Sequence, residues 1–217
     1  MNKLFIFDFD GTIADTKDIT MRGLIDYSRN NSLPIPNLNL ICNNYANCDN
    51  YDFGWNVDKE KQRYLMDKAF IFTTECIASG LYLPKIFDEA FKIIKNLYDR
   101  GHILAICTSR EKIACEKILE YYNLQKYFKV LKTRDDVTLR NKKAKPNPDL
   151  ILEIIDELKF SKDKTFIIGD TEGDILGGKN ANINTIAVTW GYCKKNNLKR
   201  LKPDYLISKF EDIFRIL

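Results

Sequence analysis

The sequence predicts an α/β fold, in which helices cover both faces of a Rossmann-like parallel sheet and a small helical cap is inserted after the first strand. Short apolar runs recur along the chain, amphipathic segments alternate with them, and one long segment near the N-terminus has no strand-like run. The 217 residues are 45% hydrophobic and 29% charged, which is enough material for a packed core with a smaller insertion. We therefore expect an α/β core domain of residues 1–15 and 84–217 and a helical cap domain of residues 16–83.

The strands are predicted from short apolar runs. The first run, Leu4-Phe5-Ile6-Phe7, stops at Asp8, as expected for a buried strand that ends at a polar edge of the sheet. Similar runs follow at residues 103–107, 165–168 and 185–188, and a weaker one at residues 128–131. Because helical segments separate them, these strands are expected to be parallel.

The helices of the core are predicted from apolar residues at helical spacing. One begins near Phe87 and ends at Gly101, since glycine is a common helix C-terminal residue. The spacing of Ile113, Lys117, Ile118 and Tyr121 predicts a second helix. A third is predicted at residues 149–159, directly after two prolines that suit a helix entrance.

The segment between the first two strands, residues 16–83, is the predicted cap. Residues 21–30 and 59–79 are expected to be helical, and an Asn-rich segment, residues 33–55, is expected to form loops between them. Tyr51, Phe53 and Trp55 could line a substrate pocket, although aromatic residues in such a small unit more often form its own core. Hinges are expected near Thr16 and Pro84.

Charge and cysteine content restrict the class of protein. The net charge of +4 suits an anionic substrate but is too small to indicate nucleic acid, and the basic runs at 140–145 and 194–202 are typical of solvated surfaces. The six cysteines form no C-x-x-C pair, and the single histidine, His102, cannot complete a zinc site with them. No signal peptide or membrane span is visible, so a reducing cytoplasm is expected.

Carboxylates follow two of the predicted strands. Asp8-Phe9-Asp10-Gly11-Thr12 places two acids two positions apart, and Gly169-Asp170-Thr171-Glu172-Gly173-Asp174 adds more after another strand. If these strands are neighbours, their carboxylates meet at one edge of the sheet and repel one another unless a cation neutralises them. Oxygen ligands without histidine or cysteine favour Mg²⁺. A helix N-cap at Asp170 or Thr171 is the simpler interpretation, and both can hold together.

Two further motifs suit phosphate. Thr108 and Ser109 follow the strand that ends at Cys107, where a hydroxyl and backbone N–H groups at a helix start can hold a phosphate oxygen. Lys145-Pro146-Asn147-Pro148 offers a positive charge on a stiff segment. Each motif alone is weak, because hydroxyl caps and surface lysines are common. Arg110 could contact a substrate anion or face solvent, and the sequence does not decide between them.

Together, the order DxDGT, strand-end threonine, Lys-Pro-x-Pro and GDxxxD resembles the four motifs of the haloacid dehalogenase superfamily. Segments 83–84, 188–192 and 202–207 resemble its phosphoglycolate-phosphatase-like subgroup, whereas the insertion matches only in position and helical character. The segment 133–144 is longer than in that subgroup, which leaves Lys142, Lys143 and Lys145 as alternatives for the phosphate-binding lysine, with Lys145 favoured. Asn182 stands where the family has a glycine, and it tolerates a left-handed turn.

This resemblance implies a Mg²⁺-dependent phosphatase that acts on a small phosphorylated metabolite. Asp8 would be the nucleophile that forms an aspartyl-phosphate, and Asp10 the general acid and base. The Mg²⁺ ligands would be Asp8, the backbone carbonyl of Asp10 and Asp170, with Asp174 completing or orienting the site. Thr108, Ser109 and Lys145 would bind the phosphoryl group.

Two alternatives remain open. A phosphosugar mutase would share the whole set of core motifs, and a non-catalytic phosphate-binding or regulatory module could use the same fold. An acid at position 10 argues against carbon–halogen chemistry, since dehalogenases of the superfamily lack it. The substrate and the oligomeric state are not indicated by the sequence.

Overall fold

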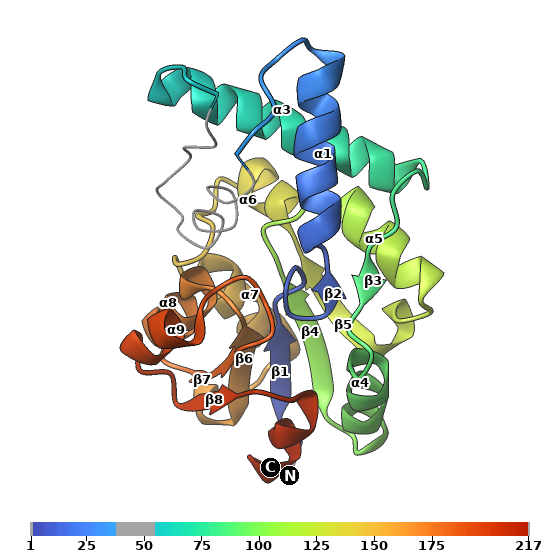
Figure 1. Ribbon diagram of the computed structural model, residues 1–217. Coiled ribbons are helices and arrows are strands. Elements are labelled where there is room, and N and C mark those ends of the chain that lie inside the picture. The colour runs from blue at the N-terminus through green and yellow to red at the C-terminus, as the bar shows by residue number, and fades with distance from the viewer. Residues whose placement is uncertain (1, 38–54, 217) are drawn as a thin grey trace.

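The computed structural model describes residues 2–37 and 55–216 (Figure 1). The strands and helices, in chain order, are β1 (Leu4–Phe7), β2 (Ala14–Asp15), α1 (Lys17–Asn30), α3 (Lys59–Ala78), β3 (Lys85–Ile86), α4 (Ala90–Asp99), β4 (Ile103–Cys107), α5 (Lys112–Tyr121), β5 (Phe128–Lys132), α6 (Arg134–Leu139), α7 (Asp149–Leu158), β6 (Thr165–Gly169), α8 (Glu172–Ala181), β7 (Asn184–Val188), α9 (Lys195–Arg200) and β8 (Tyr205–Ile207). Three short 3-10 helices complete the described part, at Gln125–Tyr127, Lys162–Lys164 and Phe210–Arg215.

Six parallel strands form the main sheet, in the order β5-β4-β1-β6-β7-β8. The predicted α/β class and all five predicted strands are confirmed. β1 lies between β4 and β6, with Phe7 paired to Ile106 on one side and to Ile168 on the other. Loops that follow these three strands therefore leave the sheet side by side at its carboxyl edge.

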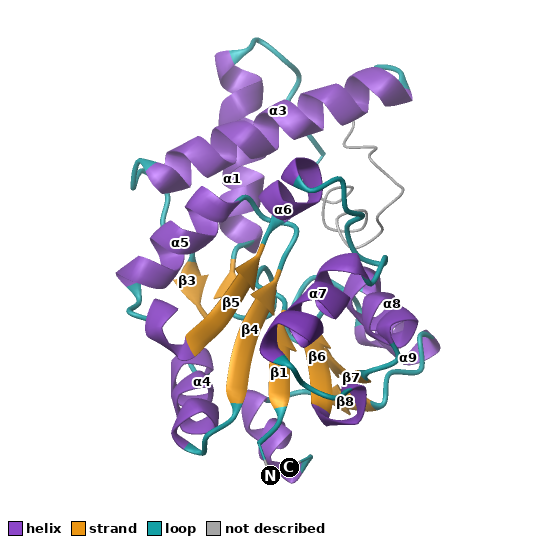
Figure 2. Cartoon of the chain, turned by 180° about the vertical axis from the view of Figure 1, so that it is seen from behind, coloured by secondary structure: helices purple, strands orange, loops and turns teal. Residues whose placement is uncertain are grey.

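Both faces of the sheet are covered by helices, as Figure 2 shows from behind. On one face, Phe5 and Phe7 of β1 pack with apolar residues of α4, α5 and the last 3-10 helix. On the other face, Leu4 and Ile6 pack with α7 and the end of α8. Residues of β1 thus alternate between two apolar layers, and the strand itself is fully buried.

Helix α5 is confirmed by the structure. Of the residues whose spacing predicted it, Ile118 is fully buried, whereas Ile113 and Tyr121 are 57% and 61% exposed. The buried residues of α5 are Ala114, Cys115, Ile118 and Leu119. These four residues belong to the main core cluster, which packs against one face of the sheet.

In the described residues, two helices lie between β2 and β3, in the segment predicted as the cap. α1 and α3 pack against each other and lie beyond the carboxyl edge of the sheet (Figure 1). β2 and β3 form a short antiparallel pair at the base of this segment, with Ala14 paired to Ile86. The domain boundaries at residues 16 and 83 stay a prediction. In the described ranges, no helix combines the length and hydropathy that a membrane crossing requires.

Candidate active site

Three adjacent strands bring the predicted site residues to one edge of the sheet. Asp8 follows β1 directly and its backbone N–H donates to Ile168 at 2.8 Å, so the ladder with β6 extends to this residue. Asp170 follows β6, and Thr108 follows β4. The expected convergence of strand ends is therefore present.

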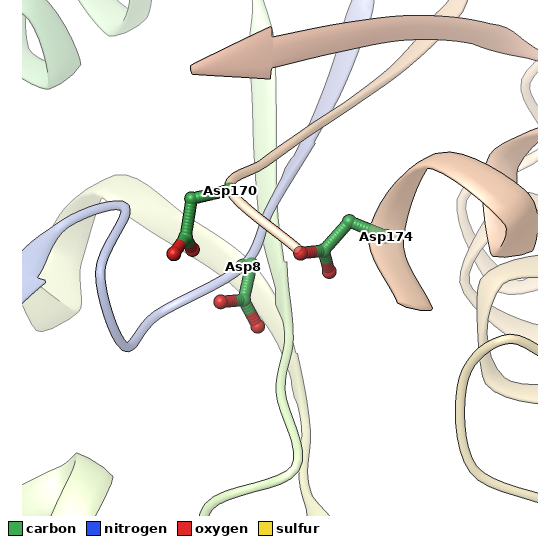
Figure 3. Close-up of side chains that lie close together, drawn as sticks. All are labelled: Asp8, Asp170 and Asp174. Carbon is green, nitrogen blue, oxygen red and sulfur yellow. The ribbon is translucent and has the colours of Figure 1, made fainter. Parts of the chain in front are cut away.

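The carboxylates of Asp8, Asp170 and Asp174 form a buried cluster (Figure 3). One oxygen from each lies within 4.8 Å of the others. Asp170 and Asp174 have no exposed surface, and Asp8 is only 7% exposed. Three acids so close together and so shielded from water need positive charge nearby.

The Asp170 carboxylate accepts hydrogen bonds from two different segments of the chain. The Thr12 hydroxyl donates to its Oδ1 at 3.0 Å, and the backbone N–H of Tyr192 donates to its Oδ2 at 2.6 Å. Two glycines allow this approach: a Cβ at Gly11 or Gly191 would lie 2.4 or 2.2 Å from Asp170 Oδ2. Gly11 also has a φ of +74°, which other residues adopt only with strain.

Asp174 has two roles in the structure. Its Oδ2 accepts from the backbone N–H and the hydroxyl of Thr171, at 3.0 and 2.6 Å, which forms a capping box at the start of α8. Its Oδ1 faces the carboxylate cluster and accepts from Lys145 Nζ at 2.5 Å. The helix cap and the charged site are thus built from the same side chain, and Thr171 rather than Asp170 is the N-cap.

Lys145 is the lysine that reaches the site. Its Nζ donates to Asp8 Oδ1 at 2.7 Å, to Asp174 Oδ1 at 2.5 Å and to the carbonyl of Cys107 at 2.8 Å. Only 7% of its side chain is exposed, whereas Lys142 and Lys143 are exposed. Its stem lies along α8 at Gly173 and Gly177, where a Cβ would come within 3.5 and 3.6 Å of it.

The pKa values of these groups follow from burial and from one another. Burial, then the charge of Asp174, raises the pKa of Asp8 well above its usual range, despite Lys145. Burial and Asp174 also raise the pKa of Asp170 to about 7, against the hydrogen bonds from Tyr192 and Thr12. Burial alone would lower the pKa of Lys145, but Asp174 and Asp8 raise it well above its ordinary value.

These residues fit a hard divalent cation. Three converging carboxylates face a single ammonium in this cluster, so ionising all of them leaves an excess of negative charge in a buried place. Burial first, and then the charge of Asp174, raise the pKa values of Asp8 and Asp170, so a cation nearby would favour their ionised forms. The donors are carboxylate oxygens, the ligand type that Mg²⁺ prefers.

Asp10 lies outside this cluster. Its carboxylate accepts from Arg110 Nε, which is 2.8 Å from both oxygens, and the two side chains are 16% and 7% exposed. The sequence did not indicate this partner for Arg110, because it depends on how the loops after β1 and β4 are placed. The only sequence sign was that both residues follow predicted strands.

The predicted phosphate-binding hydroxyls lie beside the cluster. Thr108 is buried and its Oγ1 accepts from the backbone N–H of Arg110 at 3.1 Å, so it caps the turn before α5. Ser109 is exposed. Their binding roles, like the roles of the other site residues, stay predictions.

Other candidate residues have structural surroundings. His102 lies at the opposite edge of the sheet, where its Nδ1 accepts from the Lys3 backbone N–H at 3.1 Å. Trp55 is 2% exposed and packs with Leu24 and Leu65, in the insertion's own cluster. Tyr51 and Phe53 lie outside the described residues.

The chain is similar to known proteins over most of its length. Residues 5–188 match the model of the haloacid dehalogenase-like hydrolases. Pyrophosphatase PpaX of Bacillus mycoides is 25% identical over 221 residues, covering 98% of this chain and 95% of its own. Pyrophosphatase PpaX of Oceanobacillus iheyensis is 26% identical over 216 residues, covering 99% and 96%.

Solved structures share the fold over their whole length. A predicted phosphoglycolate phosphatase from Haemophilus somnus superposes with a TM-score of 0.83 at 18% identity, covering 99% of this chain and 97% of the other. A haloacid dehalogenase-like family hydrolase from Streptococcus pneumoniae gives a TM-score of 0.81 at 18% identity, with 99% and 98% covered. At these identities the likeness shows a common fold.

Proposed function

The chain belongs to the haloacid dehalogenase-like hydrolase family, and we propose that it is a Mg²⁺-dependent phosphatase that acts on a small phosphorylated metabolite. The observation that carries the proposal is the buried cluster of Asp8, Asp170 and Asp174 with Lys145 bound to two of its members. Such a site combines a nucleophile with positive charge at a point where a phosphoryl group can enter.

In this proposal Asp8 attacks phosphorus in line and forms an aspartyl-phosphate as the leaving oxygen departs. Lys145 holds the Asp8 carboxylate in place at 2.7 Å and balances charge on the phosphoryl oxygens. Asp10 gives a proton to the leaving oxygen and then takes one from the water that hydrolyses the aspartyl-phosphate. Thr108 and Ser109 are proposed to contact the phosphoryl oxygens.

Mg²⁺ would be held by Asp8 and Asp170, together with the backbone carbonyl of Asp10, and Asp174 would complete or orient this set. When bound, the ion supplies positive charge that offsets both the carboxylates and the phosphoryl oxygens. Thr12 and Tyr192 keep Asp170 oriented toward that place.

The comparisons suggest which substrates to test first. The relatives named above are pyrophosphatases, and one structural neighbour bears the name of a phosphoglycolate phosphatase. Pyrophosphate and phosphoglycolate therefore head the panel, followed by sugar phosphates and nucleotides. A cytoplasmic location remains a prediction.

The test is phosphate release from this panel, with Mg²⁺ and with EDTA, by the wild type and by Asp8→Asn. We expect Mg²⁺-dependent release that falls by a factor on the order of 10⁴ or more in the variant. Wild-type release that survives in Asp8→Asn would overturn the assignment of the nucleophile. Phosphosugar isomerisation without net phosphate release would identify a mutase, and binding without turnover would identify a non-catalytic module.

A further inference from the structure

Two positive side chains meet the carboxylates of this site, and each has its own partners. Lys145 binds Asp8 and Asp174, whereas Arg110 binds Asp10. The proposed nucleophile and the proposed general acid–base are therefore held by different cations from different elements. The structure shows this pairing of each acid with its own cation, and the four sequence motifs alone do not indicate it.

Arg110 is itself firmly placed. Its backbone N–H donates to Thr108 Oγ1 at 3.1 Å, and its backbone carbonyl accepts from the Arg134 N–H at 3.0 Å. It precedes Glu111, the N-cap residue of α5, so its backbone belongs to a fixed helix entrance. The side chain is 7% exposed, and its Nε–H is shared between the two Asp10 oxygens at 2.8 Å each.

This geometry orients the Asp10 carboxylate. A bond shared equally by both oxygens fixes the direction of the carboxylate axis, and a charge-assisted bond in a nearly buried place is strong. Asp10 also lies at the start of a tight turn, in which the Gly11 N–H donates to the Ala14 carbonyl at 2.8 Å. A short side chain on a fixed turn, bound at its end, has few rotamers left to it.

We propose that Arg110 is the positioning residue for Asp10 in the proton transfers, an inference that rests on the phosphatase mechanism proposed above. Arg110 holds the carboxylate in one orientation while Asp10 first donates a proton to the leaving oxygen and later accepts one from water. It acts through Asp10 and forms no bond to the reacting phosphorus.

The experiment uses the dependence of rate on the leaving group. A p-nitrophenolate leaves without a proton, whereas an alkoxide needs one, so only the alkyl substrate depends strongly on a well-placed acid. We would measure kcat/KM for p-nitrophenyl phosphate and for the best alkyl phosphate in the panel. The variants are Arg110→Lys, Arg110→Ala, Asp10→Asn and the double variant Asp10→Asn/Arg110→Ala.

We expect Arg110→Ala to lower kcat/KM by about tenfold or more for the alkyl phosphate and by less than about threefold for p-nitrophenyl phosphate. Arg110→Lys should recover part of the loss, because it keeps the charge but not the planar Nε–H. The double variant should lose no more than Asp10→Asn alone, since both residues act in one step. The double variant also removes both charges of the Arg110–Asp10 pair, so it leaves no unpaired carboxylate and can be measured even if Arg110→Ala does not fold.

Arg134→Ala is the matched control. The Arg134 side chain binds Asp67 and Glu111 beside the same turn and does not contact Asp10. The variant should therefore change kcat/KM for both substrates by the same factor. Thermal unfolding of every variant would separate loss of fold from loss of rate.

Three results would count against the inference. An equal loss for both substrates in Arg110→Ala would make the ion pair merely structural. A rise in KM confined to substrates with a second anionic group would make Arg110 a substrate-binding residue. A wild type that turns over neither of these substrates nor any panel member would overturn the proposed function and this inference with it.

Discussion

The core and the helical insertion of residues 16–83 are held in different ways. In the core, the site carboxylates are buried at strand ends and each is bound by named donors from separate elements. In the described part of the insertion, α1 and α3 share a small apolar cluster that includes Leu24 and Trp55. Two of its contacts with the core are polar: Thr74 donates to Glu111 at 2.8 Å, and Arg134 donates to Asp67 at 3.1 Å.

α3 shows the contrast within one helix. Cys76 and Ile77, near its C-terminal end, belong to the main core cluster, whereas Leu65 and Met66 pack only in the insertion's cluster. Tyr64 and Ile71 on the same helix are half exposed. A reaction site needs catalytic groups held to fractions of an ångström, and the strand ends of the core hold them in this way. Substitutions in the cluster shared by α1 and α3 can alter that helix pair without displacing the site carboxylates. The following predictions test this contrast, from the largest expected effect to the smallest.

Lys145→Ala should have the largest effect, because it removes the ammonium shared by Asp8 and Asp174. We expect phosphate release to fall by about 10²–10³-fold. The free energy of unfolding of the metal-free protein should fall by several kcal/mol, because the buried carboxylates lose their cation. Lys143→Ala is the control, since Lys143 is exposed in the same segment and should leave both quantities unchanged. Equal activity of the two variants would contradict the choice of Lys145.

The pH dependence of stability tests the charge excess in the core. Asp170 has a pKa of about 7 when folded and about 3.8 when unfolded, so between these values the folded protein binds more protons. The free energy of unfolding of the metal-free protein should therefore fall as pH rises from about 4 to 7, by an amount on the order of 4 kcal/mol. Asp8 contributes in the same direction, because its pKa is also raised.

Asp170→Asn is the control for this pH dependence. It should flatten the decline and make the metal-free protein more stable than the wild type near pH 7.5, because no charge is then buried at this position. Urea unfolding at several pH values in EDTA measures both effects. A variant with the slope of the wild type would mean that other groups carry the pH dependence.

Leu24→Ala tests the insertion. Leu24 is fully buried in the insertion's cluster, so its truncation should lower the free energy of unfolding by about 2–5 kcal/mol. At temperatures where the variant remains folded, kcat for p-nitrophenyl phosphate should change little. Leu150→Ala in α7 is a matched truncation in the core. A loss of kcat in Leu24→Ala as large as in Leu150→Ala would contradict the independence of the two regions.

Thr74→Val should have the smallest effect. It removes a hydroxyl that donates to Glu111 across the junction, at a cost of about 1 kcal/mol in unfolding free energy. Chemical denaturation measures it, with Thr138→Val as the control, because that hydroxyl bonds only within exposed α6. If the two variants lose equal stability, the Thr74–Glu111 contact has no special role in joining α3 to the core.

Much of the core could be predicted from the sequence because its signals are local. Apolar runs stopped by aspartate or threonine set the strand ends, and helical spacing set α4 and α7, whose bounds differ from the prediction by only a few residues. Asn182 has the left-handed φ of +58° that its place at a helix end suggested. The carboxylate cluster was predicted on the condition that the two strands before it are neighbours, and β1 and β6 do lie side by side in the sheet.

What could not be predicted depends on contacts between distant segments. β2 and β3 have two residues each, too few to show a periodicity, and α6 and α9 have six. The pairing of Arg110 with Asp10 joins residues 100 positions apart, and nothing local distinguishes it from a solvent-exposed arginine. The sequence favoured Lys145 over Lys142 and Lys143, but it did not indicate that the Lys145 stem lies along two glycines of α8.

The three contacts of Lys145 have a consequence for how the proposed substrate is received. An ammonium has three N–H donors, and Asp8, Asp174 and the Cys107 carbonyl accept hydrogen bonds from that of Lys145. In the proposed reaction, a phosphoryl oxygen that contacts Lys145 competes with these three acceptors for its N–H donors, which limits the affinity gained from this contact. When inorganic phosphate leaves in the proposed reaction, Asp8 and Asp174 can take back these N–H donors, which favours release of the product.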